Sequence, residues 1–351
     1  MRPDEGNQPV KLTKVSLSEA PGQATINAVN VFVTGGAGYI GSVCVEELLN
    51  AGHTVTVYDN LTEGHRSAVD SRATFVLARA GEQDNIREAV ANAKADAVVH
   101  FAANIEVNES MSNPSKYFRN NVCRGLDLLD ATVAAGVKKF IFSSTCATYA
   151  PTDKMPMAED LPQAPINPYG ESKLMFEKLL QWHHKIHGLE FVAFRYFNAA
   201  GASKNFGEHH RLETHLIPNI LRVPMGLKSE CYIFGTDYAT PDGTCVRDYI
   251  HVVDLAQAHI RALQPGKQGF FNLGNGDGYS VRQVIKMCEK VTGAKIPTIE
   301  KPRRAGDASI LIASAGKAIR ELGWKPQHPG LDQIVSDAWR WHRDHPTGYP
   351  D

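Results

Sequence analysis

The sequence VFVTGGAGYIGS, residues 31–42, has the pattern of a strand, a glycine turn and the start of a helix. Four apolar or β-branched residues, typical of a buried strand, lead into glycines and then into a helical pattern. The first glycine permits the tight turn, the second lets the backbone approach a pyrophosphate, and the third lets helix and strand pack closely. The free N–H groups at the helix start face the phosphates. We therefore predict that Gly35, Gly38 and Gly41 bind a dinucleotide.

An acidic residue stands at the position that selects the cofactor. The run TVTVYD (54–59) reads as the second strand, with Asp59 at its end. A carboxylate there accepts hydrogen bonds from ribose hydroxyls and repels a 2′-phosphate. The sequence therefore predicts NAD rather than NADP.

Strand and helix patterns alternate along the chain from residue 29 onward. Three further runs are apolar without polar alternation: DAVVHFAA (96–103), KKFIFSS (138–144) and EFVAFRYF (190–197). Such runs predict parallel strands that are covered on both faces. Repeated strand–helix–strand order predicts an α/β protein with a Rossmann-type doubly wound parallel sheet. The loop-rich later part, with CYIFG (231–235) and helix-like stretches at 280–292 and 330–343, predicts a smaller, mixed α/β C-terminal substrate domain.

Composition argues against several classes of partner. The 351 residues carry a formal net charge of −1, which argues against nucleic acid and anionic membrane surfaces. No apolar run reaches the roughly 20 residues that a membrane helix needs. The six cysteines form neither a CxxC pair nor a Cys/His cluster with zinc-ligand spacing. They predict reduced thiols in a cytoplasmic protein without a metal site.

A tyrosine and a lysine one helical turn apart form the predicted catalytic pair. In PYGESK (168–173), Pro168 suits the first turn of a helix, and Tyr169 and Lys173 then share one helix face. The reference pKa of tyrosine, about 10, is too high for a base at neutral pH. A neighbouring ammonium and a bound nicotinamide cation both favour the phenolate. In a dinucleotide-binding fold, we expect this pair to accept the proton of a hydroxyl being oxidised.

Hydroxyl groups end the predicted strand before this helix. In FIFSSTCATYA (140–150), Ser143, Ser144 and Thr145 lie at the sheet edge where such folds bind ligands. One of them could relay a proton or hold the reacting oxygen. The competing interpretation is a strand that simply ends in polar residues.

Together these motifs resemble the UDP-glucose 4-epimerase family of extended short-chain dehydrogenase/reductases. The resemblance runs from about residue 30 to residue 351 and is carried by TGGAGYIGS, YDNL, HFAA, NNV, FSST, NPYGESK, RYFNAAGA, VRDYIHVVDLA and FNLGNG. It implies a homodimer that interconverts UDP-glucose and UDP-galactose through a 4-keto intermediate with tightly bound NAD. Tyr169 would take the proton of the sugar 4-OH, Lys173 would lower the Tyr169 pKa and hold the nicotinamide ribose, and Thr145 would help to shuttle the proton.

The resemblance also assigns binding residues to the matched motifs. Beside the three glycines, the cofactor would contact Tyr39, Ile40, Asp59, Asn60, Phe101, Ala102, Asn121, Ser143, Tyr169, Lys173 and Tyr196. The UDP-sugar would contact Thr145, Asn198, Leu216, Phe234, Arg247, Arg304, Asp307 and Leu311. Two arginines suit a diphosphate because a planar guanidinium binds it bidentately. Core packing is the competing interpretation for the leucine at 216 and the phenylalanine at 234.

Three domain assignments follow. Residues 1–28 form a polar N-terminal extension without the apolar core of a secretory signal. Residues 29–197 plus about 231–262 are assigned to the NAD-binding Rossmann domain. Residues 198–230 plus about 263–351 are assigned to the UDP-sugar-binding domain.

Departures from the family pattern bear on the cofactor and the sugar. Arg79 stands where an acid usually touches the adenine, and Ile105 stands where many members have a lysine near the phosphates. Leu311 aligns with the residue that limits the room around the sugar 2-substituent, where a tyrosine makes the pocket tight. The alternatives of a UDP-N-acetylglucosamine 4-epimerase and of a UDP-pentose (xylose/arabinose) 4-epimerase therefore stay open.

Other functions on the same scaffold need residues that this chain lacks. Cys146 and Ala147 follow Thr145, where related dehydratases carry Asp-Glu and related decarboxylases keep the glutamate. A non-catalytic NAD-binding protein would usually have lost Tyr169 or Lys173, and both are present.

Overall fold

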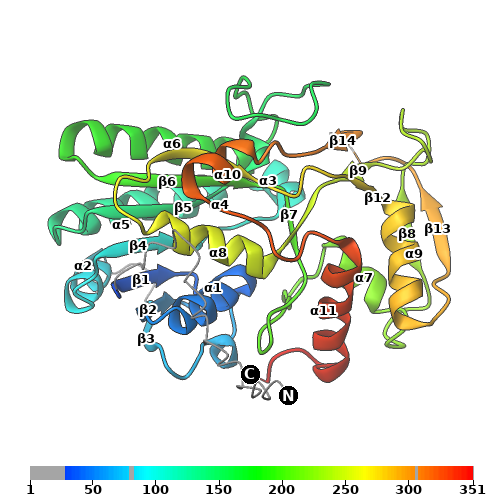
Figure 1. The fold of residues 1–351 in the computed structure, drawn as a ribbon, viewed down its shortest axis with the longest axis horizontal. Helices are drawn as coiled ribbons and strands as arrows, with labels where there is room; N and C mark the ends of the chain where they lie inside the picture. The colour runs from blue at the N-terminus through cyan, green and yellow to red at the C-terminus, as the bar shows by residue number, and fades with distance from the viewer. Residues whose placement is uncertain (1–27, 79–82, 305–306, 351) are drawn as a thin grey trace, which may run out of the picture.

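The computed structural model describes residues 28–78, 83–304 and 307–350. Its main sheet has seven strands in the order β11-β6-β5-β4-β1-β2-β3, and every neighbouring pair is parallel (Figure 1). The strands are β1 Asn30–Thr34, β2 Thr54–Asp59, β3 Thr74–Leu77, β4 Ala97–His100, β5 Lys139–Thr145, β6 Glu190–Tyr196 and β11 Gly269–Leu273. The chain order reverses between β1 and β4, as in a doubly wound fold. This confirms the predicted fold class.

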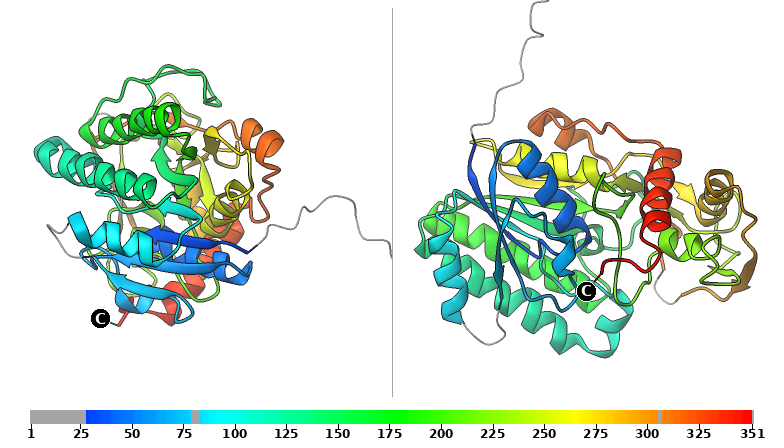
Figure 2. Two further views of the ribbon diagram at one scale, coloured as in Figure 1. Left: turned by 90° about the vertical axis from the view of Figure 1, so that its left-hand side faces the viewer. Right: turned by 90° about the horizontal axis from the view of Figure 1, so that it is seen from below.

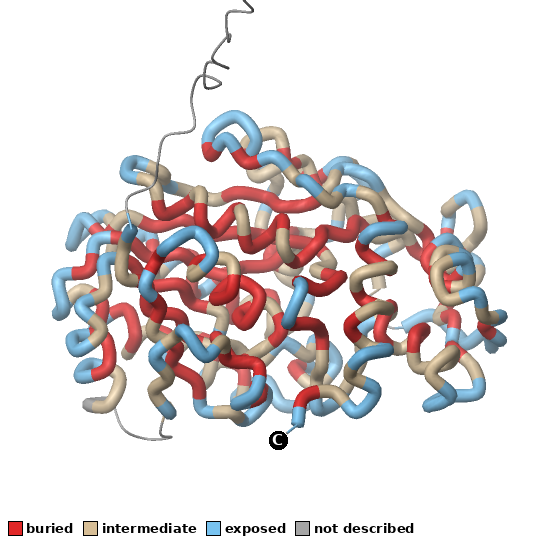
Figure 3. The backbone as a smooth tube through the Cα atoms, turned by 60° about the horizontal axis from the view of Figure 1, so that its bottom comes forward, coloured by how far each residue is buried: buried red, intermediate tan, exposed pale blue. Residues whose placement is uncertain are grey.

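Helices cover both faces of the main sheet. Successive strand side chains point to opposite faces, so Val31 and Val33 join one core cluster and Phe32 joins another. The helices over the first face are α1 Tyr39–Asn50, α8 Val252–Ala262 and α10 Gly316–Leu322. Those over the second face are α2 Gln83–Asn92, α5 Arg124–Ala134 and α6 Pro168–His187. The buried backbone accordingly runs through the middle of the molecule (Figure 3).

Helix α6 has strong signals at both ends. The Asn167 side chain accepts a hydrogen bond from the Gly170 N–H at 2.8 Å, and Pro168 occupies the first turn. The helix ends at Gly188, whose φ of 69° is in the left-handed region that glycine tolerates. These ends fix the position of the predicted Tyr–Lys pair in the first turns of α6.

A smaller mixed α/β unit lies at one end of the molecule (Figure 2). Its pairs of strands join β8 Cys231–Phe234 to β13 Thr298–Lys301 and β7 Asn198–Ala200 to β10 Tyr249–His251. A three-stranded sheet contains β12 Tyr279–Ser280, β9 Val246–Arg247 and β14 Ile310–Leu311. Helices α7 Leu216–Leu221, α9 Val281–Thr292 and α11 Leu331–Asp344 contribute to its separate apolar core.

The remaining elements are short. They are η1 Arg66–Ala68, α3 Val107–Ser112, α4 Pro114–Tyr117, the π-helical segment η2 Phe118–Cys123 and the 3₁₀ turn η3 Cys146–Thr148. Among the described residues, no helix combines the length and apolar character needed to cross a membrane.

Two strands, β8 and β11, lie in different sheets from those that their predicted domains imply. β8, assigned to the Rossmann domain, pairs with β13, and Cys231 and Ile233 pack in the core of the smaller unit. β11, assigned to the UDP-sugar domain, pairs with β6 at the edge of the main sheet. A short apolar run predicts a buried strand but carries no information on its distant partner, so the domain boundaries near these two strands stay a prediction. Residues 1–27 of the predicted extension lie outside the described residues.

Candidate active site

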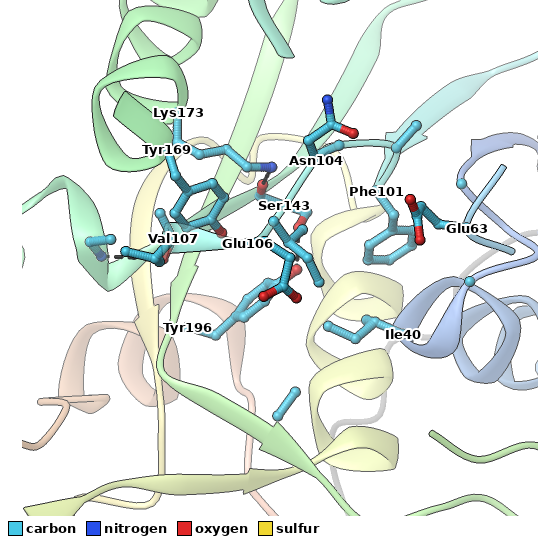
Figure 4. Close-up of a pocket in the computed structure, with 18 of the residues that line it drawn as sticks. Ile40, Glu63, Phe101, Asn104, Glu106, Val107, Ser143, Tyr169, Lys173 and Tyr196 are labelled. Carbon is cyan, nitrogen blue, oxygen red and sulfur yellow. Dashed lines mark hydrogen bonds between the residues drawn. The ribbon is translucent and has the colours of Figure 1, made fainter. Parts of the chain in front are cut away.

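A cavity of about 2470 Å³ lies at the carboxyl ends of the main strands and extends to β9 and β14 (Figure 4). Most of the predicted site residues line it: Gly35, Gly38, Tyr39, Ile40, Gly41, Asp59, Asn60, Phe101, Ala102, Ser143, Thr145, Tyr169, Lys173, Tyr196, Asn198, Arg247, Asp307 and Leu311. Such a volume exceeds the usual single-ligand pocket of roughly 300–1,000 Å³. It has room for a dinucleotide and a second ligand.

The glycine turn between β1 and α1 fits a pyrophosphate. Gly35 has φ +73°, and a Cβ on it would lie 2.5 Å from the Ala102 nitrogen. A Cβ on Gly41 would lie 2.0 Å from the Gly35 oxygen, so the helix can pack this closely only without a side chain. At Gly38, the N-cap, the nearest atom would be 3.5 Å away, and no side chain caps α1. The first N–H groups of α1 are therefore open to an anionic ligand.

The Asp59 carboxylate also stabilises the glycine turn, a role that the sequence did not reveal. Its Oδ2 accepts a hydrogen bond from the Ala37 N–H at 3.0 Å, inside the glycine turn, and its Oδ1 accepts one from the Leu61 N–H at 2.9 Å. Burial raises the pKa of this carboxyl group, and the backbone hydrogen bonds act in the opposite direction. Because an ionised carboxylate offers about four acceptor sites, Asp59 can shape the turn and still bind ribose hydroxyls.

Tyr169 and Lys173 face the cavity from the first turns of α6 (Figure 4). Lys173 is buried, and its Nζ donates a hydrogen bond to the Ser143 carbonyl oxygen at 2.9 Å. Burial lowers the pKa of Lys173 to about 7. Burial, followed by the charges of Cys146 and Glu106, raises the pKa of Tyr169 to about 12.

The direction of the Tyr169 shift differs from the prediction that Lys173 lowers it. Burial disfavours the ammonium as well as the phenolate, and the Lys173 side chain is directed to a backbone carbonyl. The group that does lower the Tyr169 pKa is Thr145, through a side-chain hydrogen bond. In the protein alone, burial is therefore the largest influence on the pKa of both Tyr169 and Lys173.

The three hydroxyl residues at the end of β5 have different surroundings. Thr145 lines the cavity with Tyr169 and acts to lower the Tyr169 pKa, and its Oγ1 accepts the Ala147 N–H at 3.2 Å. Ser143 forms a short hydrogen bond with the Tyr196 hydroxyl. Ser144 donates to Glu177 at 2.6 Å, away from the cavity lining. Thr145 is thus the member of the set that meets the tyrosine.

At the far end of the cavity, two predicted substrate residues form an ion pair. Arg247 donates to Asp307, and Leu311 lies beside Arg247 in the parallel pairing of β14 with β9. Asn198 donates to the Asp248 carbonyl oxygen at 2.9 Å. The Asp248 carboxylate itself accepts three backbone N–H groups, so it holds this end of the cavity together.

Four predicted residues do not belong to the cavity lining: Asn121, Leu216, Phe234 and Arg304. Asn121, in the π-helical segment, accepts the Asn104 N–H at 2.9 Å and donates to Ser172 at 3.0 Å, so it positions chain segments. The Arg304 guanidinium lies 4.1 Å above the Phe234 ring. Leu216 packs against the core of the smaller unit. Direct ligand contact by these residues stays a prediction, and Arg79 lies outside the described residues.

Sequence reasoning missed two groups of charged residues that line the cavity. Glu106 lies close to the Tyr–Lys pair in Figure 4 and accepts a hydrogen bond from Thr214 at 3.0 Å. Glu208, His210 and His215 come from the loop before α7. The repeated Glu and His of GEHHRLETH (207–215) were the available signal.

The fold and this cavity define the class of protein: a Rossmann-type enzyme with a dinucleotide site joined to a second ligand site. The chain matches the model of the NAD dependent epimerase/dehydratase family over residues 31–274. It is 49% identical to the UDP-glucose 4-epimerase of Lacticaseibacillus casei, over 92% of this chain and 99% of that relative. The chain therefore belongs to the NAD-dependent epimerase/dehydratase family.

Solved structures agree with this assignment. The structure described as UDP-glucose 4-epimerase from Brucella ovis in complex with NAD has a TM-score of 0.86 and 42% identity, covering 89% of this chain and 98% of that one. A UDP-glucose-4-epimerase from Stenotrophomonas maltophila, solved with NAD and formylated UDP-arabinopyranose, has a TM-score of 0.87 and 40% identity, covering 91% and 99%.

Proposed function

We propose that the chain is a UDP-glucose 4-epimerase that interconverts UDP-glucose and UDP-galactose with bound NAD. The observation that carries the proposal is that Tyr169 and Thr145 line one cavity, which runs from the glycine turn to the Arg247–Asp307 ion pair. The names of the relatives support the same activity. The open amides of α1 and the Asp59 carboxylate fit a dinucleotide with an unmodified ribose.

The chain's own residues account for the proton movement. When bound, NAD would be held by the glycine turn and Asp59 and would supply a hydride acceptor and donor. Tyr169 accepts the proton of the sugar 4-OH, with Thr145 as the hydroxyl that connects the two oxygens. Tyr169 must ionise to do so, and the partly buried site limits competition from water. Returning the same proton to the 4-oxygen completes the exchange.

The sugar preference can be tested with three substrates. UDP-galactose, UDP-N-acetylgalactosamine and UDP-arabinopyranose would be incubated separately with purified protein, and the products separated by chromatography. We expect UDP-galactose to be converted fastest. Because Leu311 lines the cavity beside Arg247, Leu311→Tyr should lower the rate with the N-acetylated sugar by roughly tenfold or more, a steric loss of about 1–3 kcal/mol.

Leu311→Met is the matched control, because it keeps the side-chain volume and should keep the relative rates. Conversion of none of the three sugars, with or without added NAD, would contradict the proposed function. Fastest turnover of the pentose or of the N-acetylated sugar would favour the corresponding alternative epimerase.

We further propose that the chain forms a homodimer in the cytoplasm. The proposed location is supported by the six free cysteines, which suit a reducing compartment. The proposed dimer is supported by an apolar stripe on α6, where Met175, Trp182 and Ile186 are 40%, 56% and 65% exposed. Their spacing of seven and four residues brings them onto one helix face, and an exposed apolar patch marks an interaction surface.

The dimer proposal predicts that two charges in this stripe separate the subunits. We expect the double variant Trp182→Glu/Ile186→Glu to be monomeric by light scattering, whereas the unchanged protein is dimeric. Leu227→Glu, which alters an apolar residue 57% exposed outside α6, should stay dimeric. If the double variant is still a dimer, the interface does not include the apolar stripe on α6.

A further inference from the structure

Four side chains with metal-binding atoms converge in the loop between β7 and α7. Glu208, His210, Glu213 and His215 each offer one such atom, and these four atoms all lie within 4.8 Å of one another. They alternate with other residues in a segment of eight, at positions i, i+2, i+5 and i+7. The proposed epimerase chemistry uses none of them. Their convergence also differs from the sequence-based expectation that the chain has no metal site.

Three of the six separations among these atoms are close to the edge length of a zinc tetrahedron, and all six are within 4.8 Å. Zinc–nitrogen and zinc–oxygen bonds of about 2.0–2.2 Å place the ligand atoms of a tetrahedron roughly 3.3–3.6 Å apart. His210 Nε2 lies 3.4 Å and His215 Nδ1 lies 3.1 Å from Glu208 Oε1, while His215 Nδ1 lies 3.2 Å from Glu213 Oε1. The three contacts are also within ion-pair distance, although longer than the 2.7–2.9 Å of the strongest charged hydrogen bonds.

The burial of the cluster calls for a positive charge. Glu208 is buried, and the Glu213 side chain is only 2% exposed. Buried carboxylates are costly unless they are paired or bind a metal. The buried His210 Nε2 makes no close hydrogen bond within the described residues and faces the Glu208 carboxylate at 3.4 Å, so it points into the cluster. One divalent cation with two neutral histidines would balance both carboxylates; two protonated histidines are the rival explanation.

The cluster lies where it can hold one wall of the cavity. The His210 ring is edge-on to the Tyr39 ring, with centroids 6.2 Å apart, and Tyr39 is the first residue of α1. Thr214, inside the same segment, bonds to Glu106 at 3.0 Å. If segment 208–215 is held in one conformation, it connects the start of α1, through Tyr39, with Glu106 near Tyr169. Four protein ligands leave no open position, as in structural zinc sites.

We propose that Glu208, His210, Glu213 and His215 form a structural Zn²⁺ site that fixes this wall of the cavity. The inference rests on the geometry of the four side chains and does not depend on which sugar the enzyme takes. Its readout is metal binding, so its failure is distinguishable from a failure of the proposed function.

The test is zinc binding by the full chain. Purified protein would be stripped with a chelator, and Zn²⁺ would be titrated in competition with a chromogenic chelator. We expect one Zn²⁺ per chain, with affinity at least about 100-fold weaker in His210→Gln and His215→Gln, since even outer-shell changes cost 10–100-fold. His183→Gln, on α6 far along the chain from the cluster, should bind like the unchanged protein.

Co²⁺ provides a second readout of the ligand set. The unchanged protein should give the visible bands of tetrahedral Co²⁺ without thiolate charge-transfer absorption, and His215→Gln should lose them. Circular dichroism checks that each variant is folded, and the exposed His215 keeps the test available if His210→Gln does not fold. Less than one tightly bound zinc per unchanged chain, or equal affinity in all folded variants, would overturn the proposal and favour the protonated histidines.

Discussion

Tyr169→Phe is expected to lower kcat for UDP-galactose by roughly 10²–10⁴-fold, the usual contribution of general acid–base catalysis. The variant removes the hydroxyl that bonds to Thr145 and leaves the ring to fill its place. NAD content should not change, because the glycine turn and Asp59 are untouched. The measurements are steady-state turnover and the amount of NAD released on denaturation.

Tyr196→Phe is the matched control for this loss. It removes another hydroxyl from the same cavity, but that hydroxyl bonds to Ser143 rather than to Thr145. We expect a loss of less than about tenfold, in keeping with the removal of one neutral hydrogen bond. Full turnover in Tyr169→Phe would show that another group is the base.

Gly35→Ala is expected to damage the cofactor site for two separate reasons, backbone strain and a steric clash. At φ +73° an alanine is strained by roughly 1–3 kcal/mol. The added Cβ would also lie 2.5 Å from the Ala102 nitrogen, a backbone clash worth roughly another 1–3 kcal/mol. We therefore expect the free energy of unfolding to fall by roughly 2–6 kcal/mol and the protein to purify without NAD.

Gly136→Ala separates backbone strain from the steric clash as causes of lost stability. Gly136 has φ +74°, but nothing lies within 4 Å of an added Cβ. This control therefore carries the backbone strain without the clash, and should cost roughly 1–3 kcal/mol and keep its NAD. Denaturant unfolding and cofactor content are measured for both variants. Equal stability and equal NAD content in the two would refute the steric argument for the turn.

The sequence predicted the parts of the molecule that depend on local pattern. The glycines before α1 and the Tyr–Lys pair of α6 were found because turn chemistry and helical spacing appear within a few residues. The pairing of β8 with β13 was missed because it joins residues about 67 positions apart, a distance at which a short apolar run gives no register.

Residues in irregular loops were the hardest to interpret. The cluster of Glu208, His210, Glu213 and His215 has neither helical nor strand periodicity, so only the folded loop brings its atoms together. The pKa shifts of Tyr169 and Lys173 were hard to predict for a different reason. Charge attraction can be inferred from spacing, whereas burial, which dominates both pKa shifts, needs the packed structure.

The most direct test of the central claim follows the hydrogen on C4. Purified protein without added NAD would be incubated with UDP-galactose carrying deuterium at C4, and the product would be analysed by NMR and mass spectrometry. We expect UDP-glucose that keeps the deuterium at C4, because only the hydroxyl proton passes through Tyr169. UDP-glucose with ordinary hydrogen at C4, or no UDP-glucose even when NAD is supplied, would contradict it.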